Sequence, residues 1–389
     1  MIQEVIVFIL GIISGIITGL LPGIHNNLIT TLLVTSGLIY KFSTKLGIIY
    51  IVSLSVTNTF TDIIPSIYLF CQSPDTAIIS TPGQKMVAEG NGHIAINNTI
   101  KGSIIAIIAF LIILFPLILI LQFYDKIEIM FPWLLSWIII LSVYRTENKI
   151  ETIIIILLSG VLGFFVLNST VNQPLLPLLT GFFGTADLIT TKTDKIPHQE
   201  LTEEKITLKE SFQILIKTLI ISPLCSLLPG LGTSQASMLG NFKKQEPKQS
   251  MILIGSINTL VLCTSFITLY SINKSRSGAA AAISQLTFLT KSDLLTIIIT
   301  ILITAIVSAK VTNLLSKKIS KKINKINFQI LKFSILIFVS ILTIAVSGVQ
   351  GTIIYITSIL IGILTIKLNV TKSSMMSCIL LSTIIYYLP

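Results

Sequence analysis

The sequence predicts an all-α polytopic membrane protein with two homologous halves and about 10–12 membrane-spanning helices. Composition is the first observation behind this fold class: 11% of the 389 residues are charged, whereas soluble domains carry about 25%. The mean hydropathy is correspondingly high, at +0.91. The second observation is that uncharged runs reach or exceed the roughly 20 residues that cross a bilayer. These runs are 102–124, 152–186, 218–242, 249–273 and 333–366.

The third observation is a motif, Leu-Leu-Pro-Gly, that occurs in each half and interrupts an apolar segment each time. Proline lacks a backbone donor and glycine tolerates dihedral angles that other residues avoid, so both copies predict a broken helix. In lipid, such a break is tolerated only where protein or a water-filled cavity satisfies the freed backbone groups. The prolines of the two breaks are Pro22 and Pro229. The residues beside them are Gly23, His25, Asn26 and Asn27 in the first half and Gly230, Gly232, Thr233, Ser234 and Gln235 in the second.

The segments that precede the two breaks share a face of small residues, a pattern that lets membrane helices approach closely. At the offset that aligns the two prolines, the aligned small residues are Gly11 with Thr218, Gly15 with Ser222, and Gly19 with Ser226. We therefore interpret residues 1–184 as a first membrane repeat and residues 211–389 as a second. The stretch between them, 185–210, holds six acidic residues and four lysines and is interpreted as a hydrophilic linker.

The first half is expected to begin with a helix over 4–21 and a second helical piece that reaches residue 40. An apolar segment over 46–70 follows and carries Asn58 and Asp62. A charged side chain amid apolar residues usually faces a bundle interior or a cavity. An aspartate that caps a helix at the membrane surface has the same pattern, so both interpretations of Asp62 stay open.

Residues 71–101, which include Asp75, are too rich in proline and glycine for a long helix. We expect either a surface loop or a re-entrant hairpin here. Three spans should follow, at 102–124, 129–144 and 152–167, and then a proline-punctuated stretch over 168–184.

The second half repeats landmarks of the first. Asn258 corresponds to Asn58, and Arg276 and Ser277 occupy the place of the loop that carries Asp75, so the charge in this loop changes sign between the halves. The segment 278–290 is too short to span and predicts a second re-entrant piece. The long run 333–366 predicts a helical hairpin that turns at 348–351.

Basic residues predict the orientation, because lysines and arginines accumulate in cytoplasmic loops. Residues 310–325 hold six lysines and no acid, and 243–248 form a second basic run. Both are expected in the cytoplasm, with the linker and the C-terminus outside. With this number of predicted membrane crossings the halves are parallel repeats. If one segment is wrongly counted as a crossing, they are inverted repeats.

Duplicated helix breaks with polar residues beside them are typical of a secondary transporter that binds its substrate at the repeat interface. Exposed helix N-termini and Arg276 favour an anion, since a guanidinium matches the two oxygens of a carboxylate. The predicted substrate site therefore combines the residues at both breaks with Asn58, Asn258, Arg276 and Ser277. Asp62 and Asp75 are candidates for coupling to protons or sodium ions. The alternative role for Arg276 is that of an anchor at the membrane interface.

These same stretches resemble a known family. The motifs within 15–25 and 228–235, with residues 59–67, 75–77, 178–184 and 276–280, are similar to the large membrane subunit of tripartite tricarboxylate transporters, the TctA (DUF112) family, in its shorter archaeal branch. The resemblance covers nearly the whole chain. It implies a multi-pass cell-membrane permease for an organic anion, driven by an ion gradient. In tripartite members a small membrane subunit and an extracytoplasmic binding protein assist.

Two departures from the family bear on these implications. The chain is short, and His25 stands where bacterial members continue with glycine. A branch that works without accessory subunits, or that takes another substrate, therefore stays open.

Two other classes of protein stay open. A channel or a lipid-handling protein could share the duplicated break, but an intramembrane enzyme would need a catalytic motif that the sequence lacks. The net charge of +11 reflects lysines between apolar runs, so no nucleic-acid partner is expected. The four cysteines have no metal-ligand spacing, and we expect no cofactor and no metal.

Overall fold

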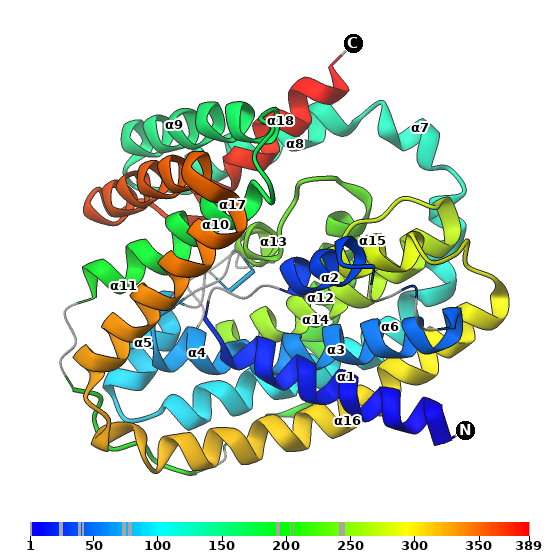
Figure 1. Ribbon diagram of the computed structural model, residues 1–389, viewed down its shortest axis with the longest axis horizontal. Coiled ribbons are helices and arrows are strands. Elements are labelled where there is room, and N and C mark those ends of the chain that lie inside the picture. The colour runs from blue at the N-terminus through cyan, green and yellow to red at the C-terminus, as the bar shows by residue number, and fades with distance from the viewer. Residues whose placement is uncertain are drawn as a thin grey trace.

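A computed structural model describes residues 2–22, 26–37, 40, 43–71, 75–76, 80–191, 195–202, 204, 206–240 and 246–388 (Figure 1). All regular secondary structure in these ranges is helical. The first half contains α1 (Ile2–Leu20), α2 (Asn26–Thr35), α3 (Thr44–Thr61), α4 (Ile63–Tyr68), α5 (Ser80–Ala88), α6 (Gly92–Leu121), α7 (Tyr124–Glu128), α8 (Phe131–Tyr144), α9 (Lys149–Leu167), α10 (Leu175–Leu179), the π-helical η3 (Thr180–Thr185) and α11 (Ala186–Thr190).

α11 continues past the predicted start of the linker, and the described residues between α11 and the second half, 191, 195–202, 204 and 206–207, form no helix. The second half contains α12 (Leu208–Leu227), α13 (Thr233–Gly240), α14 (Pro247–Ile272), α15 (Gly278–Ser284), α16 (Lys291–Ser320), η4 (Ile323–Lys325), α17 (Phe328–Lys367), η5 (Lys372–Met376) and α18 (Ser377–Tyr387).

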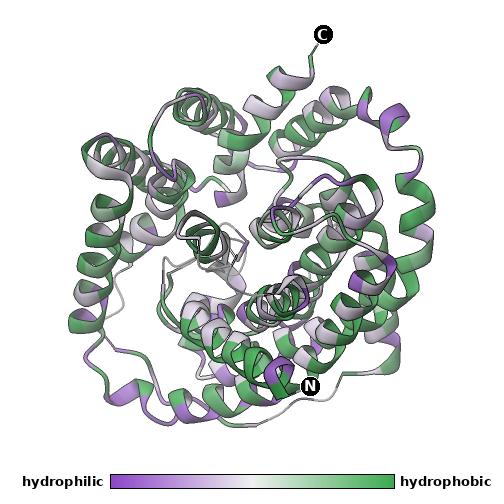
Figure 2. Ribbon diagram, turned by 45° about the vertical axis from the view of Figure 1, so that its right-hand side comes forward, coloured by the Kyte–Doolittle hydropathy of each residue, from purple (hydrophilic) through white to green (hydrophobic). Residues whose placement is uncertain are grey.

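The chain is a multi-pass membrane protein. Eight helical segments of the described residues are long and apolar enough to cross a membrane, and 131–144 and 175–190 are shorter apolar helices. Hydrophobic residues dominate the peripheral helices in Figure 2. Large apolar side chains such as Phe115 on α6 and Phe165 on α9 are exposed there, as expected of surfaces that face lipid.

The predicted hairpin at 348–351 is confirmed. Gly348 has φ +65° and ψ −163°, which divides α17 into two arms. The hydroxyls of Ser340 and Tyr355 lie 3.3 Å apart across the turn, whereas fifteen residues of straight helix would separate them by about 22 Å. The predicted non-spanning piece over 278–290 is the short α15, which ends at Ser284.

The start of α6 differs from the prediction. The helix begins at Gly92, ten residues before the expected span, and its first turns carry His93, Asn97 and Asn98 in buried positions. The polar residues lower the hydropathy of this segment, so hydropathy alone did not predict it as part of the helix. Part of the stretch before α6 is helical as well, because α5 lies between the loop that carries Asp75 and the start of α6.

The small-residue faces pack as the sequence predicts, and they fix the direction of each helix. A side chain at Gly15 of α1 would meet the backbone oxygen of Leu54 on α3 at 2.5 Å, so the two backbones are in contact. The Glu4–Lys45 ion pair (2.7 Å) aligns the starts of the same helices. α1 and α3 are therefore parallel, and the chain between them returns to its starting side.

The second half repeats this arrangement with hydroxyl groups. The side chains of Thr218 on α12 and Ser256 on α14 lie 2.7 Å apart, and Ser226 donates to Thr264 further along. α12 and α14 are parallel too. The break at Pro229 consequently lies at the far end of a helical hairpin, α12–α13.

The two halves run in opposite directions. The hydroxyls of Thr57 and Ser308 (2.9 Å) and of Tyr68 and Ser320 (2.5 Å) share hydrogen bonds, so the segment 44–68, which contains α3 and α4, runs parallel to α16. The start of α6 meets the end of α16, where His93 and Ser316 are 2.8 Å apart, so these helices are antiparallel.

The directions of α3 and α14 follow from these contacts. α6 and α14 pack side by side, with Thr99 against Gly255, and the residues that follow them, Tyr124 and Lys274, are in contact, so these helices are parallel. α3 and α14 therefore point in opposite directions. Of the two arrangements that the sequence left open, these opposite directions favour the inverted one.

The predicted side of the linker is wrong relative to the basic runs. Glu204 of the linker forms an ion pair with Lys248 (3.1 Å), and the Gln199 amide oxygen accepts from the Gly92 amide (2.7 Å). Gly92 lies beside Tyr68, which bonds Ser320 within the run 310–325. The linker therefore shares one side with Lys248 and with the run 310–325. The prediction counted 218–242 as one crossing, but this segment folds as α12 and α13, which return to that side.

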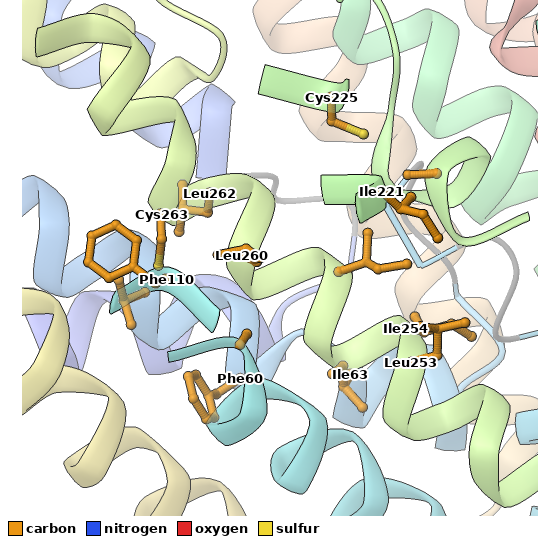
Figure 3. Close-up of a cluster of buried hydrophobic side chains, with 14 of the residues drawn as sticks. Phe60, Ile63, Phe110, Ile221, Cys225, Leu253, Ile254, Leu260, Leu262 and Cys263 are labelled. Atoms are coloured by element: carbon orange, nitrogen blue, oxygen red, sulfur yellow. The ribbon is translucent and has the colours of Figure 1, made fainter. Parts of the chain in front are cut away.

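The halves interlock rather than form separate bodies. α6 packs on α14 and α3 on α16, while α9 packs on α18 and α17 on η3. Each of these pairs joins one half to the other. Figure 3 shows part of the shared core, with apolar side chains from α3, α4, α6, α12 and α14 close to one another.

Candidate functional site

A cavity of about 310 Å³ lies where the two halves meet. Its walls come from α2, α3, the loop that carries Asp75, α10, the α12–α13 connection, α14, the end of the α14–α15 loop and the region around η5 and α18. Small-molecule sites occupy about 300–1,000 Å³. The cavity therefore suits a small ligand.

The second helix break and the helix that follows the first break both line this cavity. Leu28 and Thr31 line it from α2, directly after the first break, and residues 228–233 line it from the second. The α1–α2 and α12–α13 hairpins start from opposite membrane sides, because α3 and α14 are antiparallel. Gly230 has φ +79°, and a side chain there would meet the Thr383 hydroxyl at 2.7 Å, so glycine is required at this turn.

Most of the described residues that were predicted for the site line this cavity. They are Asn58, Asp62, Asp75, Pro229, Gly230, Gly232, Thr233, Asn258, Arg276 and Ser277. Three predicted residues are not among the lining residues. Pro22 is buried, Ser234 is buried on α13, and Gln235 accepts a hydrogen bond from the Gly232 amide (3.1 Å), so its side chain stabilises the turn.

Four predicted residues cannot be placed in the same way. Gly23 and His25 lie outside the described residues. Asn26 and Asn27 begin α2, but their side chains are not among those described.

The first half contributes the acidic side of the cavity. Asp62 lies at the junction of α3 and α4, so the cavity interpretation applies rather than a cap at the membrane surface. Its Oδ1 is buried and has no hydrogen-bond partner among the described residues. Asp75 accepts a hydrogen bond from the Thr233 hydroxyl (2.7 Å), which ties its loop to α13. Neither carboxylate has a basic partner in the described part of the chain.

The second half contributes the basic side. The Arg276 guanidinium donates to the Tyr124 hydroxyl and to the backbone oxygen of Leu227 (3.3 Å), and it lies 5.5 Å from the Tyr124 ring centre. Its Nε is buried without a partner among the described residues. Arg276 thus stabilises the C-terminal end of α12, as an anchor would, and still has donors available to a ligand in the cavity.

The two matched asparagines lie on opposite helices of the cavity. Asn58 donates to the Thr18 hydroxyl (3.1 Å), which leaves its carbonyl oxygen for another contact. The Asn258 amide nitrogen is buried with no partner in the ranges that the structure covers. Ser277 caps α15 by accepting from the Ala280 amide (3.1 Å) and lies 2.8 Å from the Ser265 hydroxyl.

Sequence reasoning missed several lining residues. Thr180 belongs to the π-helical turn η3, Gln173 has φ +49°, and Met376 ends η5. A π-helical turn and a strained residue are often found at functional sites. The proline-rich stretch before residue 184 was the available signal, but it did not indicate which side chains enter the cavity.

This architecture defines a class: a polytopic protein whose two oppositely directed halves each bring a broken helix to one polar cavity. The chain belongs to the tripartite tricarboxylate transporter TctA family, which matches over residues 5–377. It is therefore a member of a membrane transporter family.

A relative in Methanocaldococcus jannaschii is described as an uncharacterized protein. It is 31% identical over 399 aligned residues, which cover 98% of each chain. No solved structure matches the sequence significantly.

Proposed function

We propose that this protein is a secondary active transporter for a small organic anion, a carboxylate, and that a proton or sodium gradient drives it. The observation that carries the proposal is the composition of the central cavity. It places a partly unpaired guanidinium and two matched asparagines beside a buried carboxylate that has no basic partner.

Arg276 supports the choice of an anion. A buried guanidinium donor without an acceptor is costly, and a carboxylate that enters the cavity supplies one. The start of α13 adds backbone N–H groups at Thr233, near the break, and helix N-termini favour negative charge. A neutral sugar would leave these donors without a charged acceptor.

Asp62 supports ion coupling. A carboxylate in a low-dielectric cavity binds a proton or a cation in preference to remaining unpaired. Asp75 lies in the same cavity wall and adds negative charge. A coupled cation would lower the cost of bringing an anion into this cavity, which links the two binding events.

We also propose that residues 1–184 and 211–389 are inverted repeats that evolved from one unit, joined by the linker over 185–210. The matched helix pairs and their opposite directions support this. Inverted repeats around one midplane site are common in transporters that open alternately to the two sides.

The experiment is uptake into proteoliposomes that contain the purified chain alone. A panel of mono-, di- and tricarboxylates is offered, with proton and sodium gradients imposed separately. We expect saturable uptake of a subset of these acids that responds to one of the two gradients. Uptake by this chain alone also means that a small membrane subunit and an extracytoplasmic binding protein are not obligatory here.

Counterflow separates a carrier from the alternatives. A carrier accumulates labelled substrate transiently when unlabelled substrate is preloaded, and a channel does not. A lipid-handling protein shows no carboxylate flux, and an enzyme releases a changed product. Any of these three outcomes contradicts the proposal.

A further inference from the structure

A second cavity, of about 810 Å³, lies on the side of the membrane that carries the linker. It is lined by Phe70 after α4, by α5, by α11, by linker residues 195–197 and by Lys372 of η5. Nothing in the proposed function uses this cavity.

The two cavities lie along the same structural elements. The continuous helix 175–190 lines the central cavity at Thr180 and the second cavity at Asp187 and Thr190. Similarly, η5 lines the central cavity with Met376 and the second cavity with Lys372. The second cavity is therefore placed between the central cavity and the linker side.

The lining residues give the second cavity a positive charge. Lys85, Lys195 and Lys372 come from three separate elements, and Asp187 is the acidic residue among the described lining residues. Lys372 and Asp187 form an ion pair of 2.5 Å in which the Asp187 side chain is 2% exposed. Because this pair is neutral as a unit, Lys85 and Lys195 are left as the exposed cationic groups of the cavity.

We propose that this cavity is a second anion-binding site, which holds a di- or tricarboxylate between the central cavity and the linker side. The proposal rests on the carboxylate specificity argued above. Lys85 and Lys195 attract the anion, and Lys372 exchanges its Asp187 partner for the carboxylate as the ligand moves toward Met376. Two separated lysines suit a ligand with more than one carboxylate group.

The test is calorimetric titration of the purified full-length protein with citrate. We expect two classes of site in the natural protein. The double substitution Lys85→Gln and Lys195→Gln removes the weaker class, and Arg276→Gln removes the other. In transport, the double variant raises KM for citrate presented on the linker side by about three- to tenfold, because each exposed charge contributes modestly, and leaves KM on the opposite side unchanged.

The matched control is Lys321→Gln with Lys322→Gln, which removes the same charge on the same side from residues that do not line the cavity. Its titration should equal that of the natural protein. Unchanged binding in the Lys85 and Lys195 variant, or equal losses in the control, overturns the second site alone. Loss in that variant with unchanged binding in Arg276→Gln instead overturns the central site, and the absence of citrate binding in the natural protein overturns both.

Discussion

The two halves of this protein repeat one scaffold and present opposite charges to the same cavity. The first half supplies Asp62 and Asp75, and the second supplies Arg276 in the loop that corresponds to that of Asp75. The helix packing is similar in the two halves. The helix before the break packs in parallel on a later helix, α1 on α3 in the first half and α12 on α14 in the second. The difference teaches that similar helix packing brings the two halves to one cavity, while the residues at a few positions decide which charge each half offers.

The helix pairs show the same division. α1 approaches α3 through glycine, whereas α12 approaches α14 through hydroxyl groups that hydrogen-bond across the interface. In both helix pairs the contacts are made by the small residues that the sequence aligns at every fourth position. Backbone contact in the first half tolerates no added atoms, but the second half already accommodates side chains there.

The largest effect should come from the basic side of the cavity. Arg276→Gln is expected to lower carboxylate uptake at least about 30-fold, since loss of one partner of a buried charge pair costs about 2–5 kcal/mol. Tyr124→Phe is the control, because it removes a partner of the guanidinium and keeps its charge, and its effect should be smaller. Normal uptake by Arg276→Gln means that this residue is only an anchor for α12.

A substitution on the acidic side of the cavity should affect ion coupling without abolishing substrate binding. Asp62→Asn keeps the size of the side chain and removes its charge, so counterflow should persist while accumulation no longer responds to the imposed gradient. The readout is the ratio of internal to external substrate under each gradient. Gradient-driven accumulation that equals the natural protein's would exclude Asp62 from coupling.

The two helix pairs should differ in their response to substitution at the aligned small residue. Gly15→Val forces atoms into the Leu54 backbone and should lower stability by about 1–3 kcal/mol, as overpacking does. Ser222→Ala at the aligned position removes a hydroxyl that has no partner among the described residues and should change stability by less than about 0.5 kcal/mol. Thermal unfolding in detergent measures both variants. Equal shifts would mean that the two interfaces do not differ as described.

The smallest effect is expected at the hydroxyl pair of Ser226 and Thr264. Interhelical hydrogen bonds in membranes average about 0.6 kcal/mol. A double-mutant cycle with both residues changed to alanine should give a coupling energy of this size. A coupling energy near zero would show that packing alone holds α12 on α14.

Much of the fold could be predicted from the sequence because the breaks, the small-residue faces and the hairpin at 348–351 are local patterns. In lipid, a proline break must face protein or water, which is why the sequence predicts polar surroundings for Pro229; it lines the central cavity together with Asn258. The opposite charges of Arg276 and Asp75 could also be predicted, because the sequence comparison of the two halves places them in corresponding loops.

The remainder depended on contacts between distant parts of the chain. Tyr124 bonds Arg276 across 152 residues, and no sequence pattern joins them. The side of the linker depended on whether α12 and α13 cross or return, and hydropathy is the same for both. The early start of α6 was hidden because Asn97 and Asn98 are polar residues buried within protein rather than in lipid.

The central claim is that both halves bind one carboxylate in the shared cavity, and side-chain protection tests it most directly. Val261 lines the cavity and is partly exposed to it, so Val261→Cys in a variant whose four native cysteines are changed to alanine places a single thiol there. Its rate of alkylation should fall when a transported carboxylate is added, and Arg276→Gln should abolish this protection. A labelling rate that no carboxylate of the panel changes would contradict the account.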